Sequence, residues 1–244
     1  MKSSLNFTVK HESGATFDMH ELGLWVESFH IYAPNAIRKL APHENGARLK
    51  KSKLGIRRVD TTIQVESNSM IDFDQKKHLI YSIFFTDQPF EIVRDLTPGK
   101  RIFVLYEGEY DIRNISNADG DFKLELVMID PYIYGETHDL TLGSSYDTYA
   151  IQGLESPWTS RTTFAGSTSQ YTLETNEGGK IVLDYNFIAG DVLEIDYRKR
   201  KVTLNGASIA VAINMETRWF TLTPGYMALK SSHTTTLSYT ERNY

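Results

Sequence analysis

Leu124-Glu-Leu-Val-Met-Ile-Asp-Pro-Tyr-Ile-Tyr-Gly135 is the stretch that divides this chain. Its first residues are typical of a β-strand, and the strand pattern ends at Asp130-Pro131. Proline has no amide hydrogen for a β-ladder and holds the preceding residue extended, so a central strand cannot continue through it. We therefore predict a domain boundary here, with an N-terminal domain over residues 1–135 and a C-terminal domain over residues 136–244.

Upstream of this boundary the sequence is typical of β-strands, apart from one helical segment. A helix is predicted over about residues 72–85, capped by Asp72, because apolar residues recur there at helical spacing without an intervening Gly or Pro. These apolar residues are Ile71, Leu79, Ile80, Ile83 and Phe84. Strands are predicted to follow the helix, among them residues 109–116.

Downstream of the boundary, short strand patterns recur at intervals of about 8 to 12 residues between Gly, Asn and Asp turns, which is typical of an antiparallel β-sandwich. Residues 208–213 and 219–222 are among the predicted strands, and residues 136–157 are predicted to be a polar connector at the start of this domain. The predicted fold is therefore mainly β, with one α-helix in the N-terminal domain and an antiparallel sandwich after it.

The composition is that of a soluble globular protein, with 41% hydrophobic and 23% charged residues among 244. No run of 18 apolar residues occurs, so we expect no membrane-spanning helix. The chain has no cysteine, which excludes disulfides, thiolate metal sites and cysteine nucleophiles.

Charge is unevenly distributed along the chain. The formal net charge is −5, yet the segment from Ala36 to Arg58 holds eight cations and a single acid, Glu44. Its central part, from Lys39 to Lys53, has little that could form a buried face, and we predict a long exposed hairpin or loop. A basic segment on an acidic body indicates charge complementarity with a partner or with another copy.

Three interpretations of this basic segment remain open: a solvated loop, a subunit interface and a nucleic-acid contact. No aromatic residue separates its cations, which counts against the nucleic-acid contact. The candidate subunit interface consists of Arg48, Lys50, Lys51, Lys53, Arg57 and Arg58.

The sequence predicts no catalytic, cofactor or metal site. The hydrolase elbow, phosphate loop and dinucleotide motifs are absent, and the seven histidines are far apart in sequence. The segment Asn117-Ala-Asp-Gly-Asp121 resembles part of a calcium loop but lacks its full span and closing glutamate, so we predict a hairpin turn. We therefore do not expect an enzyme.

Two further groups of residues allow alternative functions. Asp191, Glu194 and Asp196 would suit a glycosidase, although Asp191 is expected at a turn and the other two on one solvated strand face. Trp158 and Trp219 could stack on sugar rings, although aromatic residues on strands more often belong to the core. A carbohydrate-binding module is thus the alternative function.

Four motifs resemble a known family. Asp130-Pro-Tyr-Ile-Tyr134 follows Pro98-Gly-Lys100, and the C-terminal half contains, in order, Gly190-Asp-Val-Leu-Glu-Ile-Asp196, Lys201-Val-Thr-Leu-Asn-Gly206 and Trp219-Phe-Thr-Leu-Thr-Pro-Gly225. Their order and spacing are similar to those of siphophage distal tail proteins, and the similarity extends from about Leu22 to the C-terminus.

The resemblance implies a structural virion protein at the phage tail tip, assembled in the cytoplasm of the host bacterium. In that family the N-terminal domains form a hexameric ring through which DNA passes, and a galectin-like sandwich projects from each. The implied partners are other copies of the chain, the tail tube protein, the tail-fibre hub protein and a receptor-binding protein. It implies no cofactor, no membrane and no sequence-specific nucleic acid.

Overall fold

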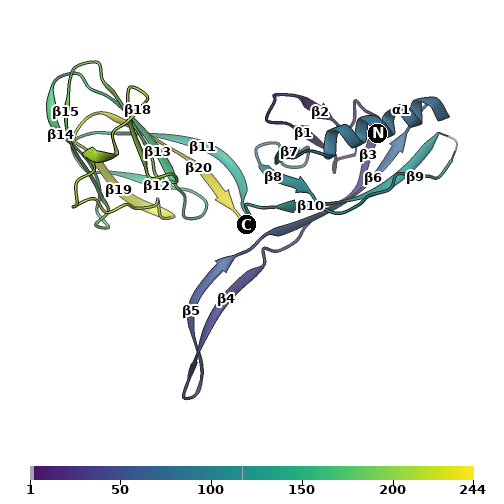
Figure 1. Cartoon of the computed structure of the whole chain (residues 1–244), viewed down its shortest axis with the longest axis horizontal. Coiled ribbons are helices and arrows are strands. Elements are labelled where there is room, and N and C mark those ends of the chain that lie inside the picture. The colour runs from purple at the N-terminus through teal and green to yellow at the C-terminus, as the bar shows by residue number, and fades with distance from the viewer. Residues whose placement is uncertain (1–2, 117) are drawn as a thin grey trace. The chain divides into compact units, whose positions relative to one another are not determined.

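The computed structural model describes residues 3–116 and 118–244 (Figure 1). The chain divides into two compact units, one that runs to Tyr134 and includes Tyr244, and one from Gly135 to Asn243. The prediction of a mainly β fold is confirmed, with a single α-helix among the described residues. No helix in that part of the chain is long and apolar enough to cross a membrane.

The first unit is an antiparallel β-structure that carries the helix. Its hydrogen-bonded strands follow the order β3-β6-β10-β8-β7-β1-β2, with β9 paired to β10 and β4 paired to β5 as a separate hairpin. The bounds are β1 Phe7–Lys10, β2 Thr16–Asp18, β3 Leu24–Ile31, β4 Ala36–His43, β5 Gly46–Leu54, β6 Arg57–Glu66, α1 Met70–Phe84, β7 Phe90–Arg94, β8 Arg101–Tyr106, β9 Arg113–Asn114 and β10 Asp119–Met128.

Helix α1 begins earlier than predicted, and its cap is Ser69, not Asp72. The Ser69 hydroxyl accepts a hydrogen bond from the Asp72 amide at 3.2 Å, while the Asp72 carboxylate accepts one from the Asn68 amide at 2.9 Å. These reciprocal bonds satisfy two amides at the start of the helix. The buried face consists of Phe73, Ile80, Ile83 and Phe84, whereas Ile71 and Leu79, two of the residues from which the helix was predicted, are 75% and 37% exposed.

The predicted strand over residues 109–116 is mostly wrong. Only Arg113–Asn114 is a strand, because Tyr110 and Ile112 turn into the core instead of pairing along an edge. The predicted hairpin turn after β9 is confirmed for the described residues, since the Ile115 amide donates to the Asp119 carbonyl at 2.9 Å. Asn117, at the start of that prediction, lies outside the described residues.

The second unit consists of two antiparallel sheets that share one core. One sheet has the order β18-β17-β16-β13-β20-β11 and the other β12-β19-β14-β15. The bounds are β11 Ile133–Leu142, β12 Asp147–Ile151, β13 Trp158–Thr163, β14 Thr168–Thr175, β15 Lys180–Phe187, β16 Val192–Asp196, β17 Lys201–Leu204, β18 Ala207–Ser208, β19 Gly225–Ser231 and β20 Thr235–Asn243.

Residues 136–157 are not a polar connector, because they contain most of β11 and all of β12. Strand β11 pairs with β20, and β12 pairs with β19 over five residue pairs. The polar residues of these strands occupy their solvated faces, while Leu142 and Ile151 enter the core. Polarity alone therefore misidentified two strands.

Two other predicted strands are not found as predicted in the structure. Residues 208–213 contain only the end of β18 followed by a 3-10 turn, η1 Ala210–Ala212. Residues 219–222 make no regular strand, and Leu222 forms only an isolated bridge with Ser156.

Candidate interaction surfaces

The predicted exposed hairpin is present as β4 and β5 (Figure 1). Its register separates two faces. Residues paired across a ladder point to the same side of the sheet. Lys39 pairs with Lys51, and a β-bulge beside Lys39 leaves Leu40 opposite Leu49. We call this side of the hairpin the basic face. Its cations are Lys39, Arg48, Lys51 and Lys53.

The opposite face of the hairpin is mainly aliphatic. It contains the pair Leu40 and Leu49, the pair Ala36 and Leu54, and Pro42 opposite Ala47, together with one cation, Arg38, opposite Ser52. Leu40 is 58% exposed and Leu49 is 53% exposed, so these two side chains are open to solvent. A hairpin with one cationic and one mainly aliphatic face has no core of its own, and such a surface is typical of a binding element.

The charges of the basic face have no counterions in the described part of the chain. No ion pair joins any of these four cations to an acid there. Lys39 and Lys51 are moreover directly opposite each other, an arrangement that destabilises a strand pair. The structure thus keeps four positive charges together that nothing in the described residues neutralises.

The other two predicted interface cations lie outside the hairpin, on β6. Arg57 is only 7% exposed, and its guanidinium donates to the carbonyls of Tyr32 and Pro131, the latter at 3.3 Å. Burial lowers the pKa of Arg57. Arg57 therefore fixes the boundary stretch inside its own unit and is not exposed in the single chain, so its place in a subunit interface stays a prediction.

Arg58 is exposed but already paired. Its Nη2 atom lies 3.0 Å from a carboxylate oxygen of Glu125 on the neighbouring strand β10. Among the six predicted interface residues, the structure brings Arg48, Lys50, Lys51 and Lys53 together on the hairpin.

A shallow depression of about 680 Å³ lies where the C-terminal end of α1 meets the segment after β8. We name it the aromatic cradle, and its rings are Tyr81, Phe85, Tyr106 and Tyr110. The ring centroids of Tyr106 and Tyr110 are 5.0 Å apart, and those of Tyr81 and Tyr110 are 5.4 Å apart. Phe85 is 74% exposed, so the cradle presents an apolar ring to solvent.

The pKa values of two tyrosine hydroxyls in the cradle, those of Tyr106 and Tyr110, are raised. Burial, followed by the charges of Glu109 and Glu125, raises the pKa of Tyr106. Burial also raises the pKa of Tyr110, well above its ordinary value. The floor of the cradle therefore carries neutral hydroxyls at Tyr106 and Tyr110.

Three acids follow this floor in sequence, and we name them the acidic rim: Glu107, Glu109 and Asp111. All three are exposed, and no ion pair involves them in the described part of the chain. Sequence reasoning missed this surface because it assigned residues 109–116 to a strand. The alternation of acids with tyrosines in Tyr106-Glu-Gly-Glu-Tyr-Asp111 was the available signal.

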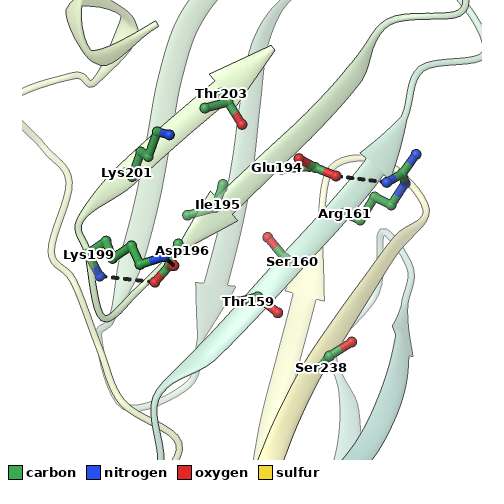
Figure 2. A pocket seen from close by; sticks show the side chains of 10 residues that line it. All are labelled: Thr159, Ser160, Arg161, Glu194, Ile195, Asp196, Lys199, Lys201, Thr203 and Ser238. Carbon is green, nitrogen blue, oxygen red and sulfur yellow. Dashed lines mark hydrogen bonds and ion pairs between the residues drawn. The ribbon is translucent and has the colours of Figure 1, made fainter. Parts of the chain in front are cut away.

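A second depression, of about 460 Å³, lies on the solvated face of β13, β16, β17 and β20 (Figure 2). Figure 2 shows two ion pairs on it: Arg161 Nη1 lies 2.7 Å from Glu194, and Lys199 Nζ lies 3.7 Å from Asp196. The other lining residues are Thr159, Ser160, Ile195, Lys201, Thr203 and Ser238. None of these residues is aromatic, so this groove offers no ring on which a sugar could stack.

Each of the three carboxylates considered for a glycosidase already has its own partner in the structure. Glu194 and Asp196 share one strand face, as predicted, but each pairs with its own cation. Asp191 is buried at a turn, where it accepts hydrogen bonds from the Ile188 amide and the Asn205 side chain. In the described residues no three His, Asp or Glu side chains gather closely enough to hold a metal ion.

The two candidate sugar-stacking tryptophans differ in exposure. Trp158 is 2% exposed, and its indole Nε1 donates to the Phe220 carbonyl at 2.8 Å, so it belongs to the core and is not available for stacking on a sugar ring. Trp219 is half-buried and packs against a cation, since the Arg200 guanidinium lies 4.8 Å from its centroid and 4.1 Å from that of Tyr197.

The two units match two different family models. The model described as the siphovirus-type tail component, C-terminal domain, matches residues 153–243, and the one described as the phage tail protein RIFT-related domain matches residues 33–128. The chain belongs to the siphophage distal tail protein family. The resemblance read from the four motifs is thereby confirmed.

Relatives within and around this family agree with the fold. The chain is 31% identical over 147 residues to the distal tail protein of Bacillus phage SPP1, a match that covers 56% of this chain and 58% of that protein. The crystal structure of SPP1 Dit, titled a paradigm of the hub adsorption apparatus in phages that infect Gram-positive bacteria, superposes with a TM-score of 0.83 at 16% identity, over 97% and 98% of the two chains. A chain of the phage P2 baseplate in its activated conformation superposes with a TM-score of 0.58 at 6% identity, over 97% of each chain.

In this family member, one of the recognised motifs has a clear backbone role. Asn205 and Gly206 adopt positive φ angles of 51° and 84° in the turn after β17. A two-residue hairpin turn that suits the twist of its strands requires such angles at both positions, and Asn-Gly supplies them at low cost. The motif therefore specifies a turn and not a ligand site.

Proposed function

We propose that this chain is a structural component of the phage tail tip that joins the tail tube to the hub of the host-adsorption apparatus. The family assignment carries this proposal, together with a hairpin whose cations lack counterions. The matched families are structural tail components and not enzymes.

The first unit would form a ring of six copies. Each hairpin would extend from β3 and β6 of one copy and brace the next copy through Arg48, Lys50, Lys51 and Lys53. Such a contact joins two different surfaces, and repetition of a heterologous contact around an axis closes a ring. DNA would pass through the bore.

The second unit is proposed as the galectin-like domain of the family, a docking point for a receptor-binding protein. The proposed partners of the ring are the tail tube protein and the hub protein. Its proposed location is the tail tip of the virion. Its proposed place of assembly is the cytoplasm of the host. The carbohydrate-binding alternative has no support at Trp158, because its ring is buried.

The native mass of the full chain, alone and with its tail tube protein, tests the proposal, together with negative-stain images. Closed rings of six are expected in at least one condition. Reversal of Arg48, Lys50, Lys51 and Lys53 to Glu should weaken the ring most at low salt, because exposed charges are then least screened. A chain that stays monomeric in the presence of tail tube protein would contradict the proposal.

A further inference from the structure

We propose that the basic face of the hairpin binds the aromatic cradle and acidic rim of a second copy of this chain. This inference rests on the proposed ring and names the surface that receives each hairpin. It requires Lys39, Arg48, Lys51 and Lys53 of one copy to lie against Glu107, Glu109 and Asp111 of the next.

The first argument is charge complementarity. The basic face brings four cations together, the rim brings three acids together within five residues, and no ion pair in the described structure involves either set. Many other exposed acids are already paired, for example Glu125 with Arg58 and Glu194 with Arg161. Patches of opposite charge steer association and fix its register. The acidic rim is therefore a better receptor for the basic face than exposed acids that already form ion pairs.

The second argument is the chemistry of the cradle floor. Lysine and arginine pack their aliphatic stems on apolar surface while the charged ends stay near acids. Tyrosine and phenylalanine faces also attract cations. The cradle offers Phe85 and Tyr106 as accessible rings directly beside the rim, and so accommodates both parts of a lysine side chain.

The third argument is the strain between like charges within the hairpin. Lys39 and Lys51 repel each other across the ladder, and the described part of one copy contains no acid paired with either of them. No hydrogen bond or ion pair joins the hairpin cations to the rim within that copy. Acids of a second copy would relieve this repulsion, and the resulting contact is heterologous, as a closed ring requires.

A charge-swap experiment tests the pairing. The hairpin variant carries Lys39→Glu, Lys51→Glu and Lys53→Glu, the rim variant carries Glu107→Lys, Glu109→Lys and Asp111→Lys, and a third variant carries all six changes. Each three-residue variant should weaken assembly by about tenfold or more at low salt, as three exposed ion pairs would. The six-residue variant should recover most of this loss.

A matched control reverses Arg198, Lys199 and Lys201 to Glu, two cations on the turn after β16 and the cation that begins β17. This variant should assemble like the native chain.

If the hairpin variant dissociates while the rim variant assembles normally, the receptor surface lies elsewhere and the inference is overturned, although the proposed ring stands. If the native chain forms no ring with tail tube protein, the proposed function itself fails.

Cross-linking gives a second test that does not depend on affinity. Because the chain has no cysteine, Lys51→Cys with Glu109→Cys introduces the only two thiols. A short bismaleimide should link assembled copies into a covalent ladder that ends at the closed ring. Lys51→Cys with Lys199→Cys should give no such ladder. Intact rings without a ladder from the first pair would overturn the inference.

Discussion

Lys39 and Lys51 lie directly opposite each other on β4 and β5, and neither is paired with an acid in the described part of the chain. Lys51→Glu should turn this repulsion into an attraction worth about 0.2–1 kcal/mol. The hairpin of the isolated chain should then become more stable while the ring becomes weaker. Hydrogen exchange of hairpin amides at low salt measures the first effect, and native mass the second.

Lys53→Glu is the control for this change, because Lys53 faces the uncharged Ile37. It alters the net charge equally but leaves the directly opposed pair of Lys39 and Lys51 in place. Equal slowing of exchange in both variants would show that net charge, and not the facing lysines, governs the stability of the hairpin.

Gly120 marks where β10 passes close to both α1 and β9. A Cβ atom there would lie 2.5 Å from the Arg113 carbonyl oxygen and 2.6 Å from the Phe73 ring. Gly120→Ala should therefore destabilise the first unit by about 1–3 kcal/mol, as overpacking does. Urea unfolding followed by circular dichroism measures this change. Gly99→Ala is the control, since a Cβ there meets nothing within 4 Å; equal midpoints for the two variants would contradict the prediction.

The hairpin was predictable from sequence because its charge and its lack of apolar periodicity are local properties. The separation of its faces was not, because it depends on the bulge beside Lys39, which shifts the alternation of β5 by one residue. Had β5 been regular, Arg48 and Lys51 would have pointed to opposite sides. The cations of the basic face therefore lie on one side of the hairpin because of the strand register, which the sequence pattern does not reveal.

The cradle was not predictable either, because it joins residues distant in sequence. Phe85 ends the helix, while Tyr106 and Tyr110 come more than twenty residues later. The alternating pattern of residues 109–116 predicted a strand, but Tyr110 packs 5.6 Å from Phe122 in the core. Tertiary packing overrode a short local pattern, a common outcome for irregular edges.

Trp158 packs at the centre of the second unit, 5.2 Å from Phe220. Trp158→Ala should cost about 3–5 kcal/mol, because it leaves a large cavity. Trp158→Phe should cost about 1–3 kcal/mol, since the Phe220 carbonyl then loses its buried donor. Calorimetric unfolding of the second unit measures both losses. Tyr226→Ala, at an 84% exposed position, should change little; a similar loss there would contradict the assignment of Trp158 to the core.

Glu174 makes the stability of the second unit depend on pH. Burial alone raises the pKa of its carboxyl, but a hydrogen bond from Lys230 at 3.0 Å and the charges of Lys230 and Lys180 outweigh this effect and hold the pKa below its ordinary value of 4.5. A carboxyl with a lowered pKa in the folded state stabilises that state above the pKa it has when unfolded. This contribution should disappear as the pH falls from about 4.5 through the lowered value.

Glu174→Gln removes the titrating group, so the variant should be less stable than the native chain at neutral pH, and the two stabilities should converge in acid. Thermal unfolding at a series of pH values measures this convergence. Glu136→Gln is the control, because Glu136 is exposed and joins no ion pair in the described residues. A constant difference between Glu174→Gln and the native chain across the acid range would mean that the Lys230 contact acts through packing, and not through the charge on the carboxylate.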